Sequence, residues 1–273
     1  GDIRLLRKQM DIVCSLPREY TFLNYLRCHD DIGWGLDYAT LSEWGMKEVP
    51  HKKYLNDYFQ GKIGGSVSRG ELYNEDPVTG DARFCATTAS MCGVESAGFE
   101  GDQRKMDQAI TKDVMLHAYM FTQSGIPMLY SGDEIGQVND YTYKKDPEKA
   151  PDSRYIHRGK FCWDLTENIG NKKSVQGRIF TALDNLERIR RSEAVFNADA
   201  EVYTKDYSDR SVLWVVRKAK GEELHAVFNF SDLPKTIWMP EKAEYTNLLS
   251  GGTDELATVD MPGWGFFWMK RKI

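Results

Sequence analysis

The sequence predicts an α/β fold, because helical segments alternate with two short strands and are followed by a separate run of β-forming segments. Apolar residues recur at helical spacing in residues 3–14, 103–124 and 179–191. Residues 22–28 and 126–130 are short aliphatic and aromatic runs without polar alternation, which is typical of strands buried on both faces of a parallel sheet. The order helix, strand, helix, strand, helix indicates parallel strands joined by right-handed crossovers.

Two features delimit the second helical segment. Gly125 comes directly after residues 103–124 and is interpreted as the C-cap of that helix. Before it, residues 35–102 are rich in Gly and polar residues, and a stretch of this length between regular elements is more often functional than idle. We therefore expect an inserted, largely irregular subdomain there, with one short helix near residues 55–59.

The last part of the chain has a different texture. From residue 196 onward, short segments rich in β-formers are separated by turn residues, and Lys220-Gly221 has the composition of a hairpin turn. This pattern predicts a separate antiparallel β-sandwich domain over residues 196–273, after an α/β part over residues 1–195.

Length and composition place the chain among globular proteins with a substantial core. It has 273 residues, of which 41% are hydrophobic and 12% aromatic, which fits one large or two smaller domains. The 36 Lys and Arg are outnumbered by 41 Asp and Glu, so the broad basic surface of a nucleic-acid-binding protein is not expected. No window of about 18 apolar residues predicts a membrane span.

Motifs for metals and cofactors are incomplete. The chain has an odd number of cysteines, and none lies in a CxxC pair or at zinc-ligand spacing from a histidine (Cys14, Cys28, Cys85, Cys92 and Cys162). Gly33 and Gly35 lack the third glycine of a dinucleotide-binding loop, and residues 76–81 lack the ligand spacing of a calcium loop. The sequence therefore predicts neither a metal nor a cofactor.

The beginning of the chain resembles neither a signal peptide nor a mature N-terminus. No Met precedes Gly1, and helical periodicity begins almost at once. We expect the chain to begin within a longer protein and to be cytoplasmic.

The cluster most indicative of chemistry is His29-Asp30-Asp31, at the end of the first predicted strand. In a (β/α)8 barrel, catalytic side chains lie at the carboxyl ends of the strands. There a histidine and a carboxylate can hydrogen-bond sugar hydroxyls and offset positive charge in an oxocarbenium-like transition state. The alternative is a turn at the strand end, capped by Asp, with a histidine that is purely structural.

Two further clusters come after the second predicted strand. Residues 131–134 (Ser-Gly-Asp-Glu) occupy the corresponding position one crossover later, and a structural role is favoured because carboxylates commonly lie at such turns and helix starts. Asp152-Ser153-Arg154 comes next, with His157 and Arg158 close behind. An arginine can bind paired oxygens with its planar fork, although a surface ion pair is its more usual role.

Three segments together resemble the α-amylase superfamily (glycoside hydrolase family 13), and more narrowly its amylosucrases. They are FLNYLRCHDDIGWGLDY from Phe22, GIPMLYSGDEIGQVNDY from Gly125 and DSRYIHR from Asp152. The HDDIGW run is the most specific, because the α-amylases share its His-Asp but generally lack the Asp-Ile-Gly-Trp that completes it. The resemblance implies a partial (β/α)8 (TIM) barrel, namely its seventh and eighth strand units with an inserted subdomain, before the β-domain.

The resemblance also implies roles for individual residues. Asp30 would hold hydroxyls of the glucosyl ring, and His29 would stabilise the transition state beside it. Arg154 would close the floor of the sucrose pocket through an ion pair with an acidic residue. Asp31 and Arg83, the latter in the GDAR run, would hold the fructosyl unit.

A retaining glucosyl transferase also needs a nucleophilic carboxylate and a general acid/base about 5–5.5 Å apart. In the superfamily these come from the fourth and fifth barrel strands, and this chain has only the two strands that match the seventh and eighth. We therefore predict that the chain is the C-terminal part of an enzyme that cleaves sucrose and transfers glucose to an α-1,4-glucan. The isolated chain is predicted to be inactive.

Alternative predictions remain open. A sucrose phosphorylase or a sucrose or starch hydrolase would differ mainly in the acceptor. In another class, the chain would be a non-catalytic carbohydrate-binding or structural fragment. The expected partners are sucrose and α-glucan or other carbohydrate acceptors, and two barrel strands with open edges predict self-association.

Overall fold

The computed structural model describes residues 1–273 as a mixture of helices and sheets with one large antiparallel sheet. Packing divides the chain into two discontinuous units. The first unit contains residues 1–24, 114–128 and 182–273, and the second contains residues 25–113 and 129–181. The predicted boundary after residue 195 stays a prediction, since each packing unit combines segments that are far apart in the chain.

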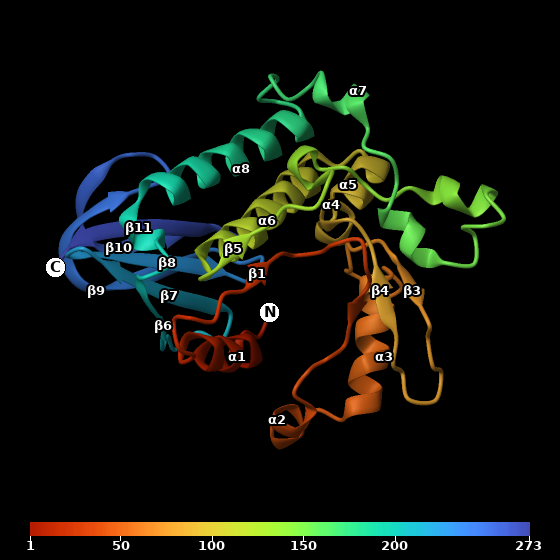
Figure 1. Cartoon of the computed structure of the whole chain (residues 1–273), viewed down its shortest axis with the longest axis horizontal. Helices are drawn as coiled ribbons and strands as arrows, with labels where there is room; N and C mark the ends of the chain where they lie inside the picture. Colours follow the sequence, from red (N-terminus) through yellow and green to blue (C-terminus); the bar gives the residue numbers. More distant parts are fainter. The chain divides into compact units, whose positions relative to one another are not determined.

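The large sheet of the first unit has six antiparallel strands in the order β10-β9-β11-β8-β7-β6. These strands belong to the last part of the chain, drawn in blue tones in Figure 1. The strands are β6 (Glu201–Lys205), β7 (Val212–Ala219), β8 (Glu222–Asn229), β9 (Lys235–Asn247), β10 (Thr253–Met261) and β11 (Phe266–Lys272). β7 and β8 are buried at nearly every position, whereas buried and exposed residues alternate in the first half of β9. The central strands are therefore covered on both faces, and the start of β9 on one face only.

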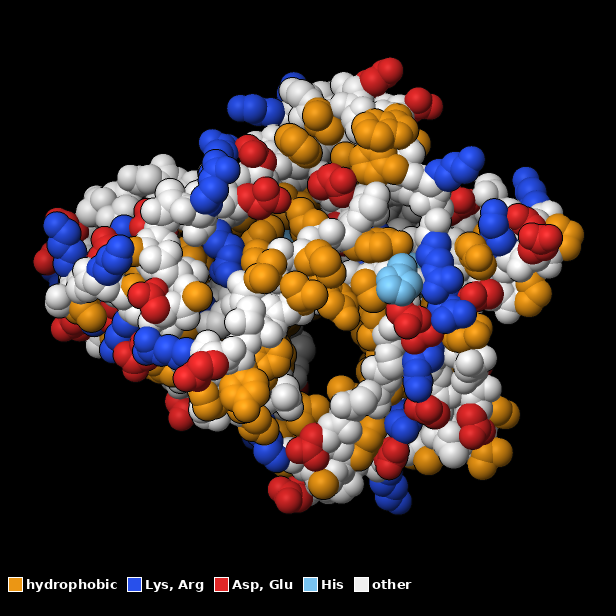
Figure 2. Space-filling view, viewed as in Figure 1, with side chains coloured by type: hydrophobic (Ala, Val, Ile, Leu, Met, Phe, Trp, Pro, Cys, Tyr) orange, Lys and Arg blue, Asp and Glu red, His pale blue; other side chains and the backbone are white.

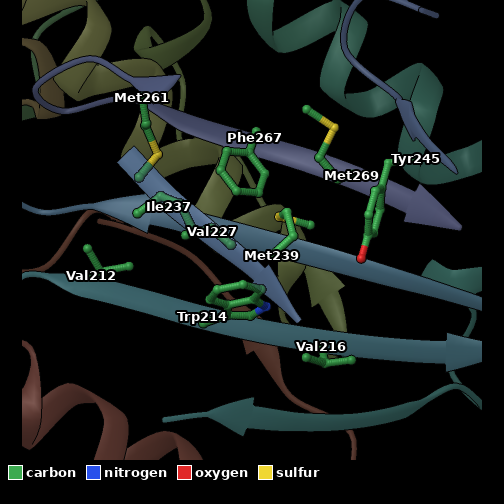
Figure 3. Packing of buried hydrophobic residues seen from close by; sticks show 10 residues of the cluster. All are labelled: Val212, Trp214, Val216, Val227, Ile237, Met239, Tyr245, Met261, Phe267 and Met269. Carbon is green, nitrogen blue, oxygen red and sulfur yellow. The ribbon is translucent and has the colours of Figure 1, made fainter. Parts of the chain in front are cut away.

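The predicted sandwich of two sheets is wrong in one respect, because all six strands belong to one hydrogen-bonded sheet. β9 pairs with β10 along most of its length and with β11 near its end, at Asn247 and Thr246. Trp214 of β7, Met239 of β9 and Phe267 of β11 nevertheless point into one hydrophobic cluster (Figure 3). The sheet must curve for these strands to share a core, so a single curved sheet encloses the apolar residues that a second sheet would cover in a sandwich.

The hairpin between β7 and β8 confirms the predicted turn. Lys220 has a φ of 50° and Gly221 a φ of 74°, so both central residues are left-handed. Two left-handed residues form the type I′ turn, whose twist matches that of the flanking strands.

The first unit also holds the two short strands predicted from the sequence, β1 (Leu23–Asn24) and β5 (Ile126–Pro127), which pair in parallel. The prediction that they are buried on both faces is wrong, because Leu23 is 59% and Ile126 is 56% exposed. Both have open outer edges in this two-stranded sheet, so no neighbouring strand covers them. The partial (β/α)8 barrel stays a prediction.

The predicted helices are present as α1 (Arg4–Cys14), α6 (Gln103–Thr122) and α8 (Val175–Ser192). Gly125 is not the C-cap of α6, which ends three residues earlier. Its φ is +113°, and a Cβ there would lie 2.3 Å from the carbonyl oxygen of Phe22. The glycine therefore permits the close approach of the chain to the β1 segment.

The second unit contains the whole insertion, which is more regular than expected. A three-stranded antiparallel sheet, in the order β2-β4-β3, is accompanied by helices. The strands are β2 (Ile32–Gly33), β3 (Glu71–Tyr73) and β4 (Arg83–Cys85), and the helices are α2 (Tyr38–Glu43), α3 (Glu48–Phe59), α4 (Thr88–Cys92), α5 (Val94–Glu100) and α7 (Trp163–Thr166). Short 3-10 turns lie at Asp133–Ile135, Tyr141–Lys145, Ser153–His157 and, in the first unit, Ala194–Phe196.

Aromatic packing explains why this Gly-rich insertion is ordered. The ring of Trp34 stacks on Phe59 of α3 at 5.4 Å and on Phe84 of β4 at 6.4 Å between centroids. Its indole N–H donates to the Asn56 side chain at 2.6 Å. The tryptophan of the HDDIGW run therefore fixes β2 to the insertion, and the residues just before it are held by this small core.

Charged side chains of both signs are interspersed over the face of the molecule shown in Figure 2. The formal net charge of −5 is spread in this way and not gathered into one broad patch on that face. None of the helices combines the length and the apolar composition that crossing a membrane requires.

Candidate functional site

A buried ion pair anchors the chain beyond both short strands. Arg27 Nε donates to Asp133 Oδ1 at 2.8 Å, and each side chain is 3% exposed. The same guanidinium donates to the carbonyl oxygens of Ser131 and His157 and lies 4.7 Å from the centre of the Tyr130 ring. Asp133 is thus committed to a structural partner, which is the role that the sequence favoured for residues 131–134.

His29 is held through its backbone, and its side chain is exposed. Its carbonyl oxygen accepts from Arg158 Nε at 2.5 Å and lies 3.4 Å from His157 Nε2. Burial lowers the pKa of His157 to about 4, so this ring is neutral at pH 7 and can donate through Nε2. His157 and Arg158 of the DSRYIHR run thereby hold the backbone of His29 in place.

Arg154 is oriented by a bidentate contact with Asp152. Arg154 Nε and Nη2 donate to the two oxygens of Asp152 at 2.8 and 2.9 Å. Asp152 also caps the following 3-10 turn by accepting from the backbone N–H of Arg154. The hydrogen bonds from Arg154 hold the pKa of Asp152 below its usual range. The two parallel bonds also hold the guanidinium in one orientation.

The remaining nitrogen of Arg154 reaches Asp30. Arg154 Nη1 lies 3.4 Å from Asp30 Oδ1, across 124 residues of sequence. The backbone N–H of Asp31 donates to the same oxygen at 2.9 Å and, with Arg154, holds the pKa of Asp30 below its usual range. Asp30 is therefore ionised at neutral pH, and its side chain is 53% exposed and accessible to a ligand.

The aromatic ring of Tyr73, in β3, packs against the guanidinium of Arg154. The guanidinium lies 4.4 Å from the centre of the Tyr73 ring, and Arg154 Nη2 is 3.5 Å from its hydroxyl. Stacking on an aromatic face stabilises a planar cation and restricts its rotation. No local pattern in the sequence points to Tyr73, because the contact spans 81 residues.

Arg83 and Asp31 form a second, looser pair. Arg83 Nε lies 3.7 Å from Asp31 Oδ1, and Arg83 Nη1 lies 3.4 Å from Asp81 Oδ2. Burial and the neighbouring charge of Asp30 raise the pKa of Asp31. Arg83 pairs with Gly33 across β2 and β4, and a Cβ at Gly33 would lie 3.3 Å from its side chain. The glycine leaves room for Arg83 to lie flat across the sheet.

The structure thus brings together four of the five residues that the sequence assigned to the site, namely Asp30, Asp31, Arg83 and Arg154. Arg154 contacts Asp30, Asp30 is linked to Asp31 through the backbone, and Asp31 pairs with Arg83. His29 joins this group through the contacts of its carbonyl oxygen. Their catalytic and substrate-binding roles stay predictions. The sequence noted Asp152, His157 and Arg158 without giving them a role, and it missed Tyr73.

The arrangement suits a polar, uncharged ligand. It offers carboxylate acceptors and guanidinium donors held in fixed directions, in roughly balanced charge, which is the pattern that recognises sugar hydroxyls. The described residues contain no group of three or more His, Cys, Asp or Glu side chains arranged to hold a metal ion.

Comparison with known proteins relates the chain to an enzyme. It is 27% identical over 173 residues to the glucosylglycerate phosphorylase of Escherichia coli (strain K12), which covers 60% of this chain and 29% of that protein. The chain therefore spans less than a third of this relative. No family model matches the chain.

Solved structures overlap the chain in part. The trehalulose synthase of Pseudomonas mesoacidophila MX-45 has a TM-score of 0.47 and 19% identity, covering 59% of this chain and 38% of that one. The trehalose-6-phosphate hydrolase of Bacillus licheniformis has a TM-score of 0.45 and 14% identity, covering 60% of this chain and 39% of that one.

Proposed function

We propose that the chain supplies the sugar-binding side of the active site in a retaining glucosyl-transferring enzyme of the α-amylase superfamily. The observation that carries this proposal is the fixed Arg154 fork, bound on one edge by Asp152 and directed at the ionised, accessible Asp30. The similarity to a phosphorylase named for a glucosyl compound supports the same class.

The geometry fits the needs of glucosyl transfer. Asp30 would accept hydrogen bonds from hydroxyls of the glucosyl ring, and its negative charge would offset the positive charge that develops on that ring. Arg154 would donate to the same ring, and the exposed His29 side chain would lie beside it. Asp31 and Arg83 would then contact the sugar unit that leaves or accepts.

The nucleophile and the acid/base are proposed to come from another segment. Asp133 is bound to Arg27, and Glu134 accepts from the backbone N–H of Gly132 at 2.8 Å. Both carboxylates of residues 131–134 are therefore engaged in holding the chain. A two-stranded parallel sheet also cannot close a barrel by itself.

The donor is proposed to be sucrose, as the amylosucrase-like motifs imply, with an α-1,4-glucan as acceptor. The second candidate is phosphorolysis, in which inorganic phosphate takes the glucosyl unit. It is favoured by the name of the relative, which is a phosphorylase. The half-exposed guanidinium of Arg83 could bind a phosphate oxygen as well as a sugar hydroxyl.

Two measurements test the proposal. Calorimetry should detect sucrose binding to the 273-residue chain and its loss in Asp30→Asn, while the same chain should release neither glucose nor fructose. Sugar release by the pure chain would contradict the proposed division of catalytic groups. Sucrose binding that Asp30→Asn leaves unchanged would contradict the site itself.

The acceptor is tested separately, in an enzyme that joins this chain to a segment carrying the missing carboxylates. Products are analysed with and without phosphate. Glucose 1-phosphate that forms only with phosphate indicates phosphorolysis, whereas glucan elongation in its absence indicates the amylosucrase reaction. Glucose and fructose alone indicate a hydrolase.

Self-association is a further part of the proposal. The open edges of β1 and β5, with Leu23 and Ile126 exposed, offer backbone groups and apolar surface to another strand. We expect sedimentation velocity to show dimers or larger species at micromolar concentration. A single monomeric species across that range would contradict this expectation.

A further inference from the structure

A second surface that fits a carbohydrate lies on the strands β9 and β10. Trp238 is 68% exposed on the face of β9 that points away from the core cluster. It is paired with Thr258 of β10, and its backbone N–H donates to the Tyr207 hydroxyl at 3.3 Å. The large indole is therefore presented to solvent by backbone that is hydrogen-bonded on both sides.

A shallow pocket lies two residues away along the same strand. Its volume is about 320 Å³, and it is lined by Pro234, Lys235, Thr236, Asp260, Met261 and Pro262. Thr236 and Trp238 share one face of β9, about 7 Å apart at the usual rise of a strand. That spacing lets a chain of two or more linked sugar units contact the indole and the pocket together.

The charges of this pocket favour a neutral ligand. Lys235 Nζ donates to Asp209 at 2.5 Å, and this hydrogen bond lowers the pKa of Asp209 to about 2, so the ammonium is already neutralised. Thr236 donates to Asp260 Oδ1 at 2.6 Å, which leaves the second oxygen of this exposed carboxylate to accept from a ligand. A phosphate or a nucleic acid would meet this carboxylate without a free cation.

We propose that Trp238, Thr236 and Asp260 form a binding surface for an α-1,4-glucan. One glucosyl ring packs its C–H face on the indole, whose electron-rich face attracts the partly positive C–H groups. A neighbouring unit donates a hydroxyl proton to Asp260. The choice of α-glucan among neutral carbohydrates rests on the proposed function, and this surface shares no residue with the site around Asp30.

The test measures maltoheptaose binding to the 273-residue chain by calorimetry, in an Asp30→Asn background that disables the donor site. We expect Trp238→Ala to weaken binding about tenfold, a loss of about 1.4 kcal/mol. Asp260→Asn should weaken it less. The matched control is Trp163→Ala, which removes another indole, 74% exposed, from the other packing unit.

Each outcome decides the proposal. Binding that falls in Trp238→Ala but persists in Trp163→Ala supports it, provided that circular dichroism shows both variants folded. Equal binding in both variants, no binding by the parent chain, or equal affinity for cellohexaose overturns it. Sucrose is titrated separately into the chain with Asp30 intact, so that loss of the proposed function and loss of this surface are distinguishable.

Discussion

Two arginine–aspartate pairs in the second unit have opposite surroundings. Arg27 and Asp133 are each 3% exposed, and the arginine also binds two backbone carbonyl oxygens. Arg154 and Asp30 lie 3.4 Å apart, with the carboxylate 53% exposed. Asp30 is only three residues beyond Arg27, so burial, and not the residue types, distinguishes a pair enclosed by the chain from one that is open to solvent.

The difference shows how a site of balanced charge can be both rigid and open. The buried pair and the His157 ring hold the segments on which the accessible side chains stand, and Asp152 fixes Arg154 on the side away from Asp30. We therefore expect substitutions in the first pair to act on stability and, under the proposed function, substitutions in the second to act on ligand affinity. Substitutions that change one pair at a time should separate these two quantities.

The largest effect is expected from Asp133→Ala. The substitution leaves Arg27 charged and buried without its carboxylate, which typically costs about 3–5 kcal/mol of the free energy of unfolding. Urea denaturation followed by circular dichroism measures the loss. If the variant does not fold, the double substitution Arg27→Met with Asp133→Leu should restore folding, because it removes both charges. A loss below about 1 kcal/mol would show that the pair is not an anchor.

A pH-dependent loss of stability is expected from His157. Its folded-state pKa of about 4 lies below the ordinary 6.5, so the unfolded chain takes up the proton first. Stability contributed by the neutral ring is present above pH 6.5 and is lost as the pH falls toward 4, by at most roughly 3 kcal/mol.

Comparing two histidine variants isolates this effect. Burial also lowers the pKa of His225, in the first unit, to about 4. His225→Gln should therefore make the free energy of unfolding depend less steeply on pH, by an amount similar to that of His157→Gln. His157→Gln should reduce the slope and also weaken sucrose binding, because it loosens the His29 carbonyl. Equal sucrose affinity in both variants would show that His157 does not support the sugar-binding site.

The sequence predicted local features better than distant pairings. Residue spacing and turn composition within short segments predict the helices α1, α6 and α8 and the turn at Lys220-Gly221. Asp30 was found because polar residues at a strand end are also a local pattern. Its contact with Arg154 spans 124 residues, and only the family resemblance placed the two in one site.

Burial was the quantity that the sequence predicted worst. An apolar run such as residues 22–28 indicates a buried strand only if other elements cover it, and β1 has one strand neighbour and an exposed Leu23. The order of the insertion was also missed, because its core consists of Trp34, Phe59 and Phe84, which are far apart in the chain. Tyr73 went unnoticed for the same reason.

A moderate effect, confined to affinity, is expected at Asp152. Asp152→Ala removes both the cap and the carboxylate that holds the Arg154 fork, whereas Asp152→Asn keeps an oxygen for the cap and loses the charge that orients Arg154. We expect Asp152→Asn to weaken sucrose binding about tenfold and to change the free energy of unfolding by less than about 1 kcal/mol. If Asp152→Asn lowered stability as much as Asp133→Ala, the two arginines would play the same role.

The smallest effect is expected at Arg83, whose side chain is 43% exposed and 3.7 Å from Asp31. Arg83→Gln should change the free energy of unfolding by about 0.5 kcal/mol or less, because exposed ion pairs contribute little. It should still raise the pKa of Asp31 further, because the positive charge of Arg83 opposes the effects of burial and of Asp30. Carboxyl titration by NMR measures this pKa.

Gly33→Ala should raise the pKa of Asp31 less than Arg83→Gln does, since a Cβ 3.3 Å from the Arg83 side chain displaces the guanidinium without removing its charge. A pKa that falls in both variants would mean that Arg83 does not act on Asp31, and the open half of the site would then consist of Asp30 and Arg154 alone.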